Sequence, residues 1–248
     1  MSLPIVVNRP VEQDDSGSDI PRDKLLASQW HTLFVLLLLG LYAYWGTIRA
    51  VRAQAGLGPS RPVMYLRTIF FELLFLGIVL AGVKFRGVSL QYVVGQRWKS
   101  AGQVFVDLGL GVALLFLSTL LVSILSGHQR AAEANQSIQY LLPQTSLEMA
   151  MWAFISMTAG ICEEAIYRGY LQRQLGALTR NVWVGIALSA AAFGGAHLYQ
   201  GVRRATVIAV SAILFGGFAE WRKTVRPGMF AHALQDGIAP LLWKIAQH

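Results

Sequence analysis

The chain has 248 residues, of which 54% are hydrophobic and only 14% are charged, and its formal net charge is +8. A soluble domain carries about 25% charged residues, so the composition favours a membrane protein, of a length that allows one compact bundle. The basic residues lie at the ends of apolar runs and form no stripe with aromatic side chains, which argues against nucleic-acid binding. The single cysteine, Cys162, excludes an intrachain disulfide.

Residues 1–28 are polar and mixed in charge, without the basic start and apolar core of a cleavable signal peptide. We expect them to form a mobile tail. Residues 29–145 are expected to supply the amino-terminal membrane helices and loops. Residues 146–248 are expected to form a second set of helices within the same membrane domain.

Long apolar runs separated by polar loops predict an all-α, polytopic membrane bundle of about seven transmembrane helices, with eight as the alternative count. The runs cover residues 30–48, 63–83, 104–125, 147–162 with an amphipathic continuation, 182–198, 205–221 and 229–245. The basic segment 84–99 is expected to lie at the membrane interface.

With seven spans, the amino terminus shares a side with the basic loops at 84–99, 172–180 and 222–226. The positive-inside rule places that side in the cytoplasm, although several arginines between residues 49 and 61 oppose it. We therefore predict an integral protein of a bacterial plasma membrane.

Inserting an ionisable side chain into a membrane span costs about 2.5–3.5 kcal/mol, so each such residue indicates a structural or catalytic role. The last four runs carry a set of carboxylate, imidazole and guanidinium groups of the kind used to activate water. They are Glu163, Glu164, Arg168, His197, His232 and Asp236.

Helix geometry separates the two adjacent glutamates, because neighbouring residues on an α-helix point about 100° apart. Glu164 and Arg168 are four residues apart and face the same way, which predicts a structural ion pair. Glu163 faces elsewhere and is free to act as a general base or as a ligand.

The hairpin between the fourth and fifth runs should turn near residues 180–181. Glu163 and His197 are almost equally far from that turn, so they are expected to meet at one depth. His232 and Asp236, again four residues apart, can form an oriented imidazole. Bringing them to the same depth requires a short or broken sixth helix, for which Gly216 and Gly217 are the candidate weak points.

Three motifs together resemble the CPBP family, which includes type II CaaX prenyl endopeptidases and bacteriocin-processing and immunity proteins. The segment from Glu163 to Arg168 resembles its EExxxR motif, Phe193 to His197 its FxxxH motif, and His232 to Asp236 its HxxxN or HxxxD motif. The resemblance covers about residues 145–245. It implies that residues 146–248 form a catalytic helical core, whose active site we expect to face the cytoplasm.

The resemblance implies a glutamic-type peptidase in which Glu163 and His197 activate water while His232 and Asp236 stabilise the oxyanion. Phe193 is then a packing residue of its motif. An ionised aspartate cannot donate a hydrogen bond as an asparagine can. Asp236 therefore either stays protonated or orients His232, and we favour the second.

Zinc is the less favoured alternative, with Glu163, His197 and His232 as its ligands. The chain has no HExxH helix, and the resemblance favours catalysis without a metal, so we expect no cofactor. Glu72, in the second run, either pairs with an arginine or lines the substrate cavity.

The sequence thus predicts an intramembrane endopeptidase that acts on a membrane-associated peptide or protein within the lipid bilayer. The reaction would be CaaX-like processing of a carboxyl terminus, or processing of a bacteriocin, pheromone or sorting signal. The alternatives are a non-catalytic scaffold or bacteriocin-immunity protein of the same fold, and a small transporter that relays protons. The absence of paired halves argues against the transporter.

Overall fold

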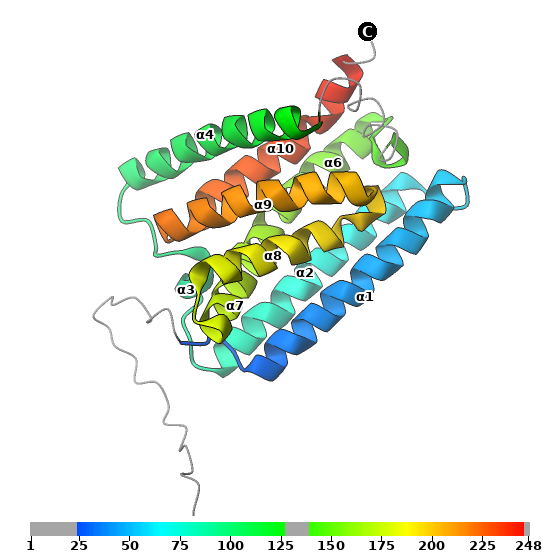
Figure 1. Ribbon diagram of the computed structural model, residues 1–248. Coiled ribbons are helices and arrows are strands. Elements are labelled where there is room, and N and C mark those ends of the chain that lie inside the picture. The colour runs from blue at the N-terminus through cyan, green and yellow to red at the C-terminus, as the bar shows by residue number, and fades with distance from the viewer. Residues whose placement is uncertain (1–23, 127–138, 246–248) are drawn as a thin grey trace, which may run out of the picture.

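The computed structural model describes residues 24–126 and 139–245, and within them it contains helices and no strand. Figure 1 shows a bundle with α1 and α2 along one side, α4 along the other, and the remaining long helices between them. The elements are α1 (Gln29–Gln54), α2 (Arg61–Phe85), α3 (Gln91–Val94), α4 (Ala101–Ser126), η1 (Gln139–Leu141), α6 (Ser146–Glu163), η2 (Glu164–Leu171), α7 (Gln172–Thr179), α8 (Val182–Ala196), η3 (Leu198–Gln200), α9 (Val202–Arg222) and α10 (Arg226–Ile245). The all-α class is therefore confirmed.

Five helical segments of the described chain are long and apolar enough to cross a membrane: α1, α2, α4, the continuous rod from Ser146 to Thr179, and α9. Large apolar side chains cover their outer faces; Trp30 is 72% exposed and Phe116 is 69% exposed. Such surfaces require a lipid environment, so the chain is an integral membrane protein. Helix α8 is apolar but has only 15 residues, and the count of seven or eight spans stays a prediction.

The rod from Ser146 to Thr179 carries the first motif at its centre. It starts with a capping box between Thr145 and Glu148, which satisfies free N–H groups at the helix start. Residues Glu164–Leu171 are wound as a π-helix, and all eight are buried. π-Helical turns are rare and occur often at functional sites. The sequence pattern, read as a regular α-helix, did not predict this change of winding.

Helix α9 runs unbroken from Val202 to Arg222, so the expected break at Gly216 and Gly217 is wrong. The short helix α3 explains how the third motif reaches its depth. The Val94 carbonyl accepts hydrogen bonds from the Val225 backbone N–H (3.2 Å) and the Thr224 hydroxyl (2.9 Å), which fixes the turn between α9 and α10 against α3.

Helix α3 also packs directly on the π-helical segment. At Gly169 the two backbones approach so closely that a Cβ atom would collide with the Val93 carbonyl. The α9–α10 turn is therefore held beside η2, while α7 extends past that turn, as Figure 1 shows. A few residues into α10, the chain has returned to the level of the first motif without any broken helix.

The segment before α1 is tied to α7. Leu26 and Ala27 are buried, and their backbone N–H groups donate to the Gln174 side chain at 2.6 and 3.3 Å. The predicted tail covers residues 1–28, of which 1–23 lie outside the described residues. Its last residues belong to the packed fold.

Candidate active site

His232, on α10, sits between three carboxylates. Its Nδ1 atom lies 3.0 Å from Glu164 Oε1, and its Nε2 atom lies 3.6 Å from both Glu163 Oε2 and Asp236 Oδ2. An imidazole that faces carboxylates at both nitrogens satisfies all these contacts in its doubly protonated form, because only that form donates from both atoms. The third motif is thereby joined to both glutamates of the first.

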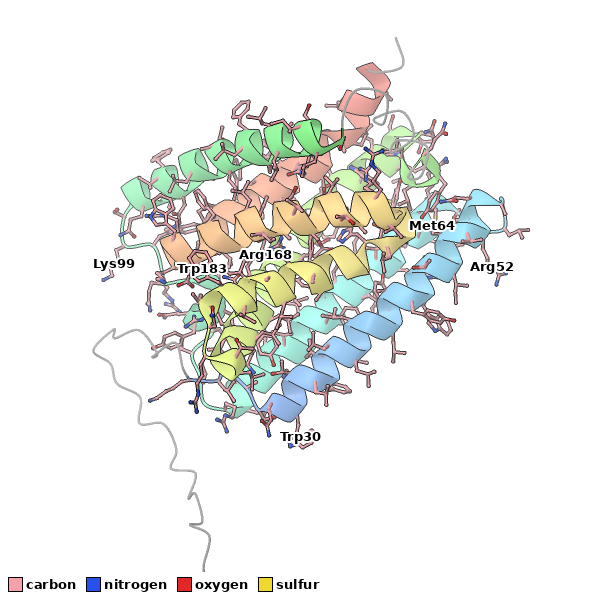
Figure 2. The ribbon with its side chains drawn as sticks, in the orientation of Figure 1. Trp30, Arg52, Met64, Lys99, Arg168 and Trp183 are labelled. Carbon is pink, nitrogen blue, oxygen red and sulfur yellow. The ribbon has the colours of Figure 1, made fainter. Side chains whose placement is uncertain are left out.

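Glu164 and Arg168 form the ion pair that their spacing predicted. Arg168 Nη1 lies 2.9 Å from Glu164 Oε1, and both side chains are almost fully buried. The guanidinium also stacks on the ring of Phe193, at 4.3 Å from its centroid, and lies 5.5 Å from that of Phe215. Figure 2 shows Arg168 inside the bundle. Aromatic faces and one carboxylate replace the water that a buried cation loses.

His197 follows the last residue of α8. Its Nδ1 atom lies 2.9 Å from the Phe193 carbonyl, and its ring packs on the Phe193 ring at 4.6 Å between centroids. With Nδ1 as the donor, Nε2 is the free acceptor. Phe193 thus orients the imidazole of His197 through its carbonyl and stacks on Arg168 through its ring. It therefore connects the second motif to the first.

A cavity of about 260 Å³ brings the motif residues together. Glu163 and His197 both line it, but no ion pair within 4.0 Å joins them among the described residues; the imidazole nearest to Glu163 is His232. The hairpin register predicted that the two residues meet at one depth. Both line one cavity, but no ion pair between them is present among the described residues. The motif residues that line it are Glu163, Glu164, Arg168, Phe193, His197, His232 and Asp236.

Glu72 lines the same cavity, which is one of the two alternatives predicted for it. Its side chain is buried, and its Oε2 atom has no hydrogen-bond partner among the described residues. The cavity extends from the motif residues toward η1 and η3, where Leu141 and Tyr199 line it.

The residues of the zinc alternative do not fit a metal site. Within residues 24–126 and 139–245, no three His, Cys, Asp or Glu side chains gather in a way that could hold a metal ion.

Sequence reasoning missed two contacts that build this site. Glu164 accepts from His232 in addition to Arg168, and a carboxylate has the capacity for both because it offers about four lone-pair sites. Trp152 Nε1 donates to the Asp236 backbone carbonyl at 2.9 Å. A buried indole N–H requires an acceptor, and that requirement was the available signal.

Residues 144–238 match the family model described as Type II CAAX prenyl endopeptidase Rce1-like. Every motif residue of the cavity lies inside this range. The match covers 95 of the 248 residues, which is less than half of the chain. An Rce1-like match implies a protease, and it agrees with the resemblance seen in the three motifs. No curated protein and no solved structure matches the chain. The comparison with known proteins therefore rests on the Rce1-like match of residues 144–238.

Proposed function

We propose that the protein is an intramembrane endopeptidase in which Glu163 activates a water molecule. The supporting observation is that Glu163 and His197 line one cavity without touching each other. Glu163 acts as the general base and takes a proton from water, whose oxygen attacks the carbonyl carbon of the peptide bond. His197, held at Nδ1 by the Phe193 carbonyl, offers Nε2 as the acceptor that orients the water.

His232 stabilises the oxyanion that this attack creates. Glu164 fixes its ring from the Nδ1 side, and Asp236 lies on the Nε2 side, so the imidazolium is oriented before the reaction begins. Glu163 then passes its proton to the leaving nitrogen, and the C–N bond breaks. The products are a carboxylate and an amine. Glu164 and Arg168 position His232 without touching the substrate.

The substrate class is a membrane-associated protein or peptide. The matched family model names CAAX prenyl endopeptidases, so a prenylated CaaX-like terminus is the first candidate. Processing of a bacteriocin, a pheromone or a sorting signal uses the same chemistry. A membrane-anchored substrate reaches a cavity between helices by lateral diffusion, which suits a site enclosed by apolar helices.

The test uses purified protein in lipid nanodiscs, incubated with S-farnesylated CaaX-type peptides and, separately, with peptides from membrane-protein digests. Mass spectrometry should show cleavage by the wild type and none by E163Q, while thermal unfolding shows that E163Q is folded. If E163Q also rescues a deletion phenotype as well as the wild type does, the scaffold or immunity alternative replaces the enzyme.

The sequence predicts that both the amino terminus and the active site lie on the cytoplasmic side, and the fold brings these two predictions into conflict. Arg61, at the start of α2, donates to the Tyr140 carbonyl in η1 at 3.1 Å, so the cavity end of the bundle is opposite to the start of α1. A cytoplasmic active site therefore places the start of α1 on the outer side, against the charge pattern. Labelling of L57C and K99C in intact cells with an impermeant maleimide decides which end is outside, since Cys162 is buried.

A further inference from the structure

A second cavity, of about 170 Å³, adjoins the catalytic one between α1, α2 and η1. The two cavities share Glu72, Glu163 and His197 among their lining residues. Two arginines line only the second: Arg49 from the last turns of α1 and Arg67 from the second turn of α2. A peptide that extends from the catalytic residues into this space meets both guanidinium groups.

Neither of these two cations has a counter-ion in the part of the chain that the structure describes. No carboxylate of residues 24–126 and 139–245 lies within 4.0 Å of either guanidinium. The Nε atoms of Arg49 and Arg67 are buried and have no hydrogen-bond partner in that part of the chain. The guanidinium of Arg49 stacks on the ring of Tyr42, with its Cζ atom 5.0 Å from the ring centroid. Two half-buried cations without a carboxylate partner in that part of the chain are costly, and an anion that accepts their hydrogen bonds lowers this cost.

The spacing of the arginines from the catalytic residues indicates which anion fits. Arg67 and Glu72 lie five residues apart on α2, which is about 7.5 Å along the helix axis. An extended peptide advances about 3.3 Å per residue. A negative charge bound at Arg67 therefore lies about two to three residues from a peptide bond at the level of Glu72 and Glu163.

We propose that Arg49 and Arg67 bind the C-terminal carboxylate of the substrate. This assignment rests on the proposed function and deepens it, because it makes the protein selective for a peptide bond a short distance from a free carboxyl terminus. Tyr140 lines the same cavity, and burial raises its pKa to about 12. It is a neutral phenol at physiological pH and can donate to the same carboxylate.

A lipid phosphate is the competing anion. Phosphates of lipid headgroups are reached most easily from exposed side chains such as Arg52, which lies one turn beyond Arg49 and points away from the bundle in Figure 2. Arg49 and Arg67 are instead half-buried and line a space that continues to the catalytic residues. The geometry therefore favours the substrate carboxylate.

The test measures binding in the inactive E163Q background, so it does not depend on hydrolysis. Two fluorescent, S-farnesylated CaaX-type peptides of identical sequence, one ending in a carboxylate and the other in a carboxamide, are titrated against protein in phosphatidylcholine nanodiscs. We expect tenfold or greater preference for the carboxylate, as loss of a charge-assisted hydrogen bond costs about that factor. R49Q and R67Q should each reduce this preference severalfold, whereas R49K and R67K should keep part of it.

R52Q is the matched control on the same helix and should keep the full preference. Equal affinity for both peptides, a preference that survives in R49Q and R67Q, or binding of neither peptide to folded protein would overturn the assignment. If phosphatidylglycerol in the nanodisc abolishes the preference of the parent protein for the carboxylate, the site belongs to a lipid phosphate and the assignment also fails. If E163Q prefers the carboxylate peptide but the protein with Glu163 intact does not hydrolyse it, the proposed function is contradicted and the assignment of the two arginines stands.

Discussion

The imidazole Nδ1 of His232, on α10, lies 3.0 Å from the Glu164 carboxylate in the π-helical segment. This contact joins two motifs that are 68 residues apart in the chain. It gives Glu164 a second partner besides Arg168 and makes one carboxylate responsible for both the buried ion pair and the orientation of the catalytic ring. The two adjacent glutamates therefore differ in what their removal should do.

E164A should lose folded protein, because it leaves Arg168 as an unpaired buried cation. Breaking a buried pair costs about 3–5 kcal/mol. Thermal unfolding in detergent should show this loss, whereas E163Q should unfold close to the wild-type temperature, since Glu163 is partly exposed to the cavity. K223A removes the more exposed ion pair with Glu220 and should change stability by less than about 0.5 kcal/mol. A stable E164A protein would show that the pair is not structural.

D236N tests whether Asp236 acts by orienting His232. The asparagine side chain can still accept from His232 Nε2, which lies 3.6 Å from the present carboxylate. We expect D236N to keep kcat within about tenfold of the wild type, and D236A to fall by a further factor of about ten to a hundred. Equal activity of D236A and the wild type would remove Asp236 from the mechanism.

Contacts within one motif could be predicted from helix periodicity, because residues four apart lie on nearly the same face of a helix. The pairing of Glu164 with Arg168 follows from that rule. The contact of Glu164 with His232 does not follow from it, because this contact depends on where the turn between α9 and α10 lies along the bundle. That position is set by α3, a helix of four residues whose sequence carries no periodic signal.

The zinc alternative predicts that activity depends on a bound metal. The described residues 24–126 and 139–245 predict the opposite, since no three of their His, Cys, Asp or Glu side chains gather in a way that could hold a metal ion. Dialysis against EDTA and 1,10-phenanthroline should leave kcat unchanged within about twofold, and elemental analysis of active protein should find zinc well below one equivalent. Loss of cleavage that added Zn²⁺ restores would reinstate the metal mechanism.

Gly169 tests whether α3 sets the depth of the third motif. A Cβ atom at this position would collide with the Val93 carbonyl, which belongs to the backbone and cannot rotate away. G169A should therefore separate α3 from η2 and cost about 1–3 kcal/mol of stability, as overpacking does. Because α3 also holds the α9–α10 turn through Val94, cleavage should fall as well, even below the unfolding temperature. G109A, where the added methyl group meets nothing within 4 Å, is the matched control and should keep both activity and stability. If G169A behaves like G109A, the close packing of α3 does not determine where His232 lies.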